Sequence, residues 1–193
     1  MTSDEEVLRA RFWGLLAALL ASPPSQQVLD TLAAMPGDDT AIGRALAELA
    51  AAARATDPAA AEEEFTTLFI GLSRGELVPF ASYYRTGFLH EKPLAALRAD
   101  LAELGIEIAD GISEPEDHIA IVAEIMQALI DGSLGSPLPL SEQKRFFAAH
   151  IEPWAGRFFT DLESCPAAGF YRPVGTLGRL FLEVEVLAFA MTD

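Results

Sequence analysis

The chain has 193 residues, of which 51% are hydrophobic and 22% charged, and this balance excludes intrinsic disorder and a low-complexity or collagen-like chain. Its length predicts a single domain covering residues 1–193, with enough chain to bury a sizeable core. The protein is acidic: 13 Lys and Arg against 29 Asp and Glu give a formal net charge of -16, which disfavours nucleic acid as a partner and favours basic peptides.

Cysteine and histidine usage excludes several kinds of site. Cys165 is the only cysteine, so the sequence offers no intramolecular disulfide and no cysteine-based zinc or iron–sulfur site, which fits a reducing compartment. The three histidines, His90, His118 and His150, are not spaced at i+3 or i+4 from one another. We therefore expect no metal and no cofactor.

The N-terminal apolar stretch, residues 12–21, falls short of the roughly 20 apolar residues that a membrane-spanning helix needs. The acidic residues Asp4, Glu5 and Glu6 that precede it have the wrong charge for the start of a signal peptide. We expect no transmembrane segment and a cytoplasmic protein.

Helix start and stop signals recur along the whole chain. Capping residues, prolines at first helical positions and glycines at helix ends alternate with apolar residues at helical spacing. The one alternating segment, residues 105–109, is short and has no partner strand. The sequence therefore predicts an all-α fold, a single helical bundle of about nine helices. The expected helices cover residues 3–22, 25–35, 40–55, 57–70, 93–104, 115–130, 141–151, 153–164 and 173–191.

Periodicity fails between residues 75 and 93, where Phe80, Tyr83 and Tyr84 crowd into a segment predicted to be mostly loop, with one helical turn. Loops with this much apolar surface often carry function. Residues 71–92 and 132–140 are also candidate hinges within one bundle.

The usual catalytic motifs are absent from the sequence, which contains no phosphate-binding loop, no HExxH and no Gly-x-Ser-x-Gly. Gly175 and Gly178 form the nearest glycine pair, which we interpret as close helix packing or a cap. Cys165 is interpreted as a small packing residue. We do not expect an enzyme.

Residues 113–119 combine several features of a helix start. Ser113 and Glu116 have capping-box spacing, with Pro115 and three carboxylates in the predicted first turn. His118 is unusual there, because an imidazolium is disfavoured at the positive end of a helix. We expect His118 to be either neutral or charged through the adjacent carboxylates, and a cap or hydrogen bond inside the bundle is an equally good interpretation.

Residues 114–118, Glu-Pro-Glu-Asp-His, resemble the Glu-Pro-x-Asp-His signature of the TorD/DmsD/NarJ family of redox-enzyme maturation chaperones. Three further segments match in the right order. Residues 65–71 resemble the family's aromatic-x-x-Leu-Phe-x-Gly stretch, residues 79–84 its Pro-aromatic-x-Ser-x-Tyr segment, and residues 150–154 its His-x-x-x-Trp element.

The resemblance implies an all-helical cytoplasmic chaperone. Such a protein binds the twin-arginine leader and apo form of a molybdenum oxidoreductase, assists cofactor insertion and delays export until maturation. Relatives are both monomers and domain-swapped dimers, and both remain open here. The residues that match the family's proposed peptide surface are Leu68, Phe69, Phe80, Ser82, Tyr84, Pro115, Asp117 and His118.

Elementary chemistry agrees with this site on one point. A twin-arginine leader presents two guanidinium groups followed by an apolar run, so its receptor needs carboxylates beside an apolar groove. We expect the site between residues 68–84 and the start of the Pro115 helix. Leu68 and Phe69 are also typical of a core, and because neighbours on a helix differ by about 100°, one of them can be buried while the other faces the groove.

Two other classes of function stay open at this stage. Guanine-nucleotide binding has been proposed for some relatives, and a purely structural helical subunit of a larger complex is the third possibility. The sequence names neither the client enzyme nor the oligomeric state.

Overall fold

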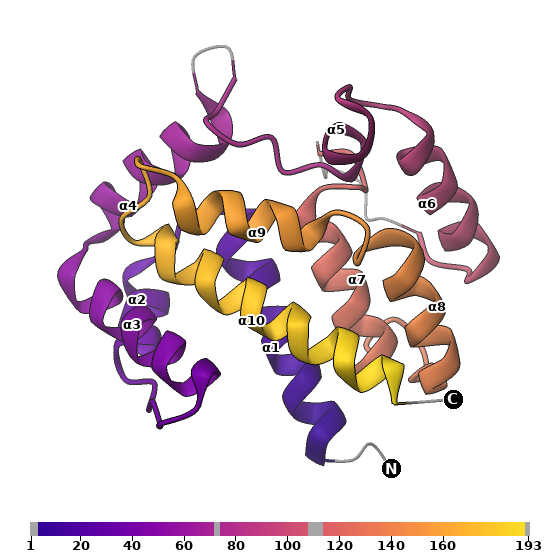
Figure 1. Ribbon diagram of the computed structural model, residues 1–193, viewed down its shortest axis with the longest axis horizontal. Coiled ribbons are helices and arrows are strands. Elements are labelled where there is room, and N and C mark those ends of the chain that lie inside the picture. The colour runs from indigo at the N-terminus through magenta and orange to yellow at the C-terminus, as the bar shows by residue number, and fades with distance from the viewer. Residues whose placement is uncertain (1–3, 72–73, 108–113, 192–193) are drawn as a thin grey trace. The chain divides into compact units, whose positions relative to one another are not determined.

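A computed structural model of the chain describes residues 4–71, 74–107 and 114–191, and these contain ten α-helices, one π-helical turn and no named strand (Figure 1). The prediction of an all-α fold is confirmed. The α-helices are α1 (Asp4–Ala21), α2 (Gln26–Ala33), α3 (Ala41–Ala55), α4 (Pro58–Phe65), α5 (Ala81–Thr86), α6 (Lys92–Glu103), α7 (Ile119–Asp131), α8 (Leu140–His150), α9 (Ala155–Ser164) and α10 (Tyr171–Ala190), and the π-helical turn is η1 (Thr66–Ile70).

The expected helices agree with the observed ones except in two places. The helix expected over residues 57–70 is α-helical only to Phe65 and continues as the π-helical turn η1, whereas the one helical turn expected between residues 75 and 93 is present as the six-residue helix α5. The helix expected from residue 115 begins instead at Ile119. Residue 3, where the first expected helix starts, and the expected capping residue Ser113 lie outside the described residues, as do residues 108–109 of the strand candidate.

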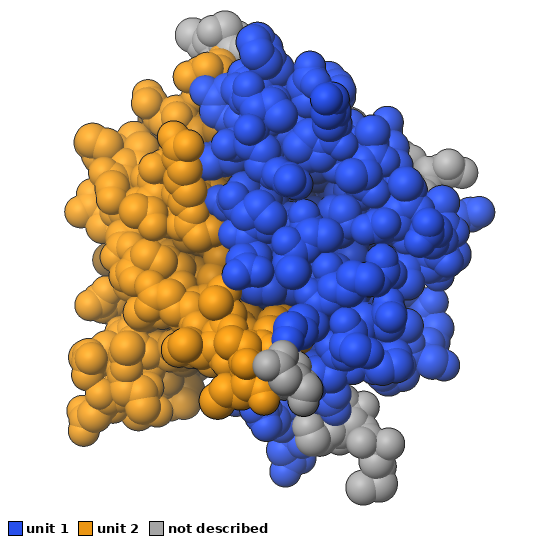
Figure 2. All heavy atoms as spheres, turned by 45° about the vertical axis from the view of Figure 1, so that its right-hand side comes forward, with its two compact units in different colours: residues 1–17, 79–154, 192 blue, residues 18–78, 155–191, 193 orange. Residues whose placement is uncertain are grey.

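The chain forms two compact units, each built from separated stretches of sequence (Figure 2). Among the described residues, unit 1 comprises 4–17 and 79–154, and unit 2 comprises 18–78 and 155–191. The chain therefore passes between the units within α1 and again at residues 78–79 and 154–155. That the units form one domain stays a prediction.

Unit 1 is organised around α7, whose sequence is apolar on almost every side and is buried accordingly. Trp13 of α1 and Phe147 of α8 meet edge to face with ring centroids 6.3 Å apart. Arg9 also joins α1 to α8, because its guanidinium donates to Gln143 Oε1 at 3.0 Å. Unit 1 thus supplies a packed scaffold for α5, α6 and the segment that leads into α7.

Unit 2 contains a hairpin of α9 and α10, which lie side by side in Figure 1. A Cβ atom on Gly178 would come closer than 3.0 Å to the Phe159 ring, and one on Gly175 would lie 2.5 Å from the backbone nitrogen of Glu163. The interpretation of this glycine pair as close helix packing is confirmed.

Helix α10 begins at an unusual cap in the same unit. The Glu64 carboxylate of α4 accepts backbone N–H groups of Gly169 at 2.8 Å, Phe170 at 2.9 Å and Tyr171 at 2.8 Å. A carboxylate at this end of a helix pairs the free amides and complements the helix dipole. Glu64 therefore fixes α4 to the start of α10.

Candidate functional site

Two of the segments singled out in the sequence, residues 79–84 and 114–118, meet in unit 1. Phe80 and His118 form an isolated antiparallel bridge. Ala81 N–H donates to the Asp117 carbonyl at 3.0 Å, and Ile119 N–H donates to the Pro79 carbonyl at 2.9 Å. The backbone thus brings together six of the eight predicted site residues: Phe80, Ser82, Tyr84, Pro115, Asp117 and His118.

Asp117 faces inward. Its side chain is almost completely buried, and Oδ2 accepts the Ser82 backbone N–H at 2.7 Å. Phe80, the N-cap residue of α5, provides no side-chain hydrogen bond to that helix, so the Asp117 carboxylate serves as the cap. In this structure Asp117 positions α5 and presents no carboxylate to the surface.

His118 is the N-cap residue of α7, and its Nδ1 accepts the Ala120 N–H at 3.2 Å. Burial lowers the pKa of His118 from 6.5 to about 4, so the imidazole is neutral at pH 7, with its proton on Nε2. Of the interpretations open from the sequence, the structure supports a neutral, capping histidine.

Because His118 caps α7, this helix begins later than the sequence predicts. Residues 115–118 form a turn, in which the His118 N–H donates to the Pro115 carbonyl at 3.0 Å. The His118 backbone is extended, so helical geometry begins only at Ile119. The prediction of a helix from Pro115 is therefore wrong, because the histidine itself supplies the cap.

The aromatic members of the site are only partly buried. Phe80 packs edge to face on the His118 ring with centroids 5.0 Å apart, and Tyr84 lies 5.7 Å from Trp154. Pro115 is also half-buried, whereas Ser82 is fully buried and its hydroxyl has no hydrogen-bond partner in the structure. Phe80, Tyr84 and Pro115 therefore keep part of their surface accessible, whereas Ser82 has none.

The His-x-x-x-Trp element also lies in unit 1, where it supports this arrangement. Trp154 Nε1 donates to the His150 carbonyl at 2.7 Å. His150 Nε2 lies 2.6 Å from Asp100 Oδ2, which joins α8 to α6. These two hydrogen bonds hold Trp154 where it packs on Tyr84.

Leu68 and Phe69, the remaining two predicted site residues, belong to unit 2 and lie in the π-helical turn η1. Leu68 is completely buried, and its carbonyl accepts the Leu77 N–H at 2.8 Å. Phe69 is half-buried, with its ring 5.0 Å from Phe65 and 5.5 Å from Tyr171. Leu68 is thus the buried member of the pair, and that Phe69 faces a peptide groove stays a prediction.

Sequence reasoning missed an ion pair beside the motif. Arg98 of α6 forms a salt bridge with Glu116, in which Arg98 Nε lies 2.9 Å from Glu116 Oε1 and Arg98 Nη2 lies 2.7 Å from Glu116 Oε2. This pair holds the pKa of the Glu116 carboxyl below its ordinary value. Glu116 was interpreted only as a capping residue, because nothing in the sequence connects it with a residue 18 positions earlier.

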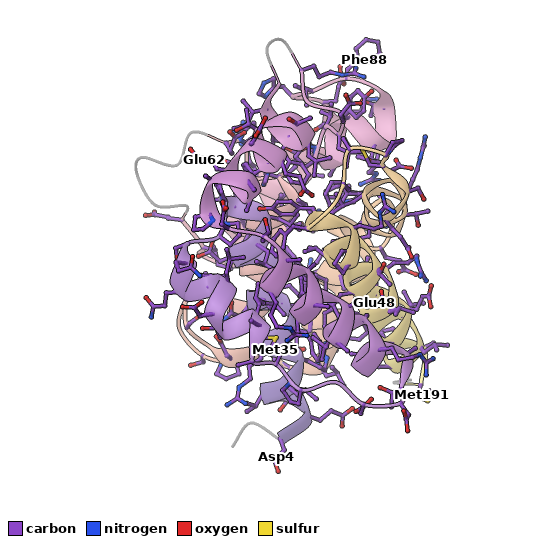
Figure 3. All side chains as sticks on the ribbon, turned by 90° about the vertical axis from the view of Figure 1, so that its left-hand side faces the viewer. Asp4, Met35, Glu48, Glu62, Phe88 and Met191 are labelled. Atoms are coloured by element: carbon purple, nitrogen blue, oxygen red, sulfur yellow. The ribbon has the colours of Figure 1, made fainter. Side chains whose placement is uncertain are left out.

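The connection between α5 and α6 is a second feature that the sequence pattern did not predict. Phe88 is 70% exposed and projects from the surface (Figure 3), and Leu89 beside it is 45% exposed. His90 follows with a φ of 59°, a left-handed conformation that costs a non-glycine residue roughly 1 kcal/mol or more.

Within residues 4–71, 74–107 and 114–191, no group of three or more His, Cys, Asp or Glu side chains is placed to hold a metal ion. In the same stretches no helix has the length and apolar content needed to cross a bilayer.

Comparison with known proteins gives the class. The family model described as nitrate reductase delta subunit matches residues 35–160. The chain is 29% identical over 129 residues to the chaperone protein TorD of Vibrio cholerae serotype O1, covering 63% of this chain and 59% of that one. It is 29% identical over 132 residues to the chaperone protein TorD of Aliivibrio salmonicida, covering 64% and 61%.

The fold has a counterpart among solved structures. The crystal structure of a proposed redox enzyme maturation protein from Archaeoglobus fulgidus matches with a TM-score of 0.59 and 24% identity, over 95% of this chain and 96% of that one. At this identity the match shows the fold alone.

The chain is thus an all-helical protein similar to redox-enzyme maturation chaperones. The chain belongs to the nitrate reductase delta subunit family, the NarJ/TorD group, which confirms the resemblance found in its motifs. It aligns with about three-fifths of the length of the curated relatives.

Proposed function

We propose that this chain is a cytoplasmic maturation chaperone without catalytic activity. It binds the twin-arginine leader and apo form of a molybdenum-containing oxidoreductase, assists cofactor insertion and delays export until the enzyme is mature. The proposal draws on family membership and on the named role of the TorD relatives.

The structural observation that carries the proposal is the junction of residues 79–84 with 114–118. It presents partly exposed aromatic side chains, Phe80 and Tyr84, next to a segment with an exposed Glu114 and a half-buried Glu116. Apolar surface beside carboxylates is what a dibasic leader with an apolar run requires.

Burial divides the proposed peptide surface into two roles. The partly exposed residues Phe80, Tyr84 and Pro115 of unit 1 are proposed to touch the leader. The buried residues Ser82, Asp117 and His118 are proposed to hold those contacts in place. Leu68 and Phe69 belong to unit 2, and their proposed role in peptide binding rests on their family motif alone.

Calorimetric titration with a synthetic leader tests the proposal. We expect the Arg-Arg leader to bind, and replacing both arginines with lysines to weaken binding because an ammonium cannot reproduce the two-pronged contact of a guanidinium. Affinity should fall, without vanishing, as salt shortens the Debye length from about 10 Å at 0.1 M to about 3 Å at 1 M. No binding by either leader would contradict the proposal.

Two parallel measurements separate the other classes of function. Magnesium-dependent binding of a guanine nucleotide in the same calorimeter would favour a nucleotide-binding protein. Recovery of a permanent partner at fixed stoichiometry, with no leader binding, would favour a structural subunit. We expect neither.

A further inference from the structure

An open pocket of about 520 Å³ lies in unit 1, where it is lined by the C-terminal half of α6, residues 105–107 and Glu116. Leu101 and Ile106 contribute apolar surface to it. Arg98, Glu107 and Glu116 add charged groups to the same pocket. Apolar surface beside carboxylates suits a long side chain that ends in a cation.

The pocket already holds a guanidinium group from the chain itself. Both Glu116 carboxylate oxygens contact Arg98 nitrogens, at 2.9 Å, 3.0 Å and 2.7 Å. The Arg98 side chain is 57% exposed and that of Glu116 is 21% exposed. Glu116 is therefore the more enclosed partner, and its carboxylate geometry is suited to a planar guanidinium.

We propose that this pocket receives an arginine side chain of the twin-arginine leader, with Glu116 and Glu107 as its carboxylate contacts and Arg98 as the internal guanidinium that the leader displaces. The proposal rests on the proposed function and specifies where the leader's charge is recognised. It assigns the contact to the variable position of the Glu-Pro-x-Asp-His motif, since the neighbouring Asp117 is buried and engaged by the Ser82 N–H.

Displacement of Arg98 is physically reasonable because it exchanges one guanidinium for another on the same carboxylate. Glu116 stays paired throughout, so no charge is left buried without a partner. Arg98, which is mostly exposed, returns to water at small cost. Glu107 is exposed and adds a second negative charge beside the incoming arginine.

The proposal predicts changes of opposite sign for the two partners of the ion pair. Glu116→Gln should weaken binding of the Arg-Arg leader about threefold to tenfold, because it removes the charge from the contact. Arg98→Met should tighten binding about twofold to fivefold, because it removes the internal competitor while keeping an unbranched side chain. Glu107→Gln should weaken binding by a smaller factor.

Matched controls lie on the same helix outside the pocket. Lys92→Met removes the same charge as Arg98→Met, and Glu103→Gln removes the same charge as Glu116→Gln, from exposed positions on α6. We expect each control to change leader affinity by less than about twofold, because salt screens the interaction between a single exposed charge and the leader. Circular dichroism and thermal unfolding confirm that each variant is folded.

Leader variants complete the experiment. Replacing the leader arginines with alanine one at a time should reveal one position whose loss costs much less in the Glu116→Gln protein than in wild type. If the leader binds and Glu116→Gln, Arg98→Met and Glu107→Gln all behave like the controls, or if Arg98→Met weakens binding, this inference is wrong while the proposed function stands. If the leader does not bind wild-type protein at all, the proposed function itself fails.

Discussion

Lowering the pH from 7.5 to 5 is expected to reduce the free energy of unfolding by about 2 kcal/mol through His118 alone. Its pKa in the folded protein is about 4, against 6.5 for the ordinary group. The unfolded chain therefore binds a proton that the folded chain does not. The stabilisation is complete above pH 6.5 and is lost as the pH falls toward 4, and a difference of one pKa unit corresponds to about 1.4 kcal/mol.

The control is His118→Asn. Asparagine is a good N-cap residue, and its side-chain oxygen can accept the Ala120 N–H that Nδ1 accepts now. The variant loses the ring that packs on Phe80, so it should be less stable at pH 7.5. When the pH is lowered from 7.5 to 5, the free energy of unfolding of the variant should fall by about 2 kcal/mol less than that of the wild-type protein.

Urea denaturation of both proteins at the two pH values measures this difference, and the subtraction removes the contribution of every other titrating group. NMR of the imidazole nitrogens gives an independent measurement, with Nδ1 unprotonated and Nε2 protonated at pH 7. A His118 that titrates near pH 6.5, or an identical pH dependence in the two proteins, would refute the assignment of a buried neutral cap.

Three further predictions concern stability measured by urea denaturation. Gly178→Ala should destabilise by about 1–3 kcal/mol because its Cβ would overlap a ring of α9, whereas Gly156→Ala in α9, with nothing within 4 Å, should be neutral or stabilising by up to about 1 kcal/mol. Glu64→Ala should cost about 2 kcal/mol by leaving three amides at the start of α10 unpaired, while the exposed Glu63→Ala should stay within about 0.5 kcal/mol of wild type. Ser82→Ala should be neutral within about 0.5 kcal/mol, since its buried hydroxyl has no partner to lose, and a large loss would show a hydrogen bond that the structure lacks.

The helical class and most helix limits follow from local rules. Ser25, Thr40 and Asp57 each act as the side-chain cap that their positions predict. Gly132 ends α7 in the left-handed conformation, as a glycine after an apolar run predicts. Such signals involve residues a few positions apart, so the sequence contains them directly.

The candidate site could be predicted from the sequence only in part. The motifs at residues 79–84 and 114–118 identified the segments, yet their spacing said nothing of which side chains face inward. Asp117 looked like an open carboxylate and is instead the cap of a helix 35 residues earlier in the chain. Burial is a property of the packed unit, which no local pattern specifies.

By itself, then, the sequence determined the all-α class, the family and the segments that form the candidate site, because capping, periodicity and motif order are local. Tertiary structure alone decided that Asp117 and His118 are buried and that Glu116 pairs with Arg98, 18 residues away. It also decided that Glu64 caps a helix more than 100 residues later. Each of these depends on which surfaces meet when helices pack, and hydrogen-bonding groups excluded from water then take whatever partner that packing brings within reach.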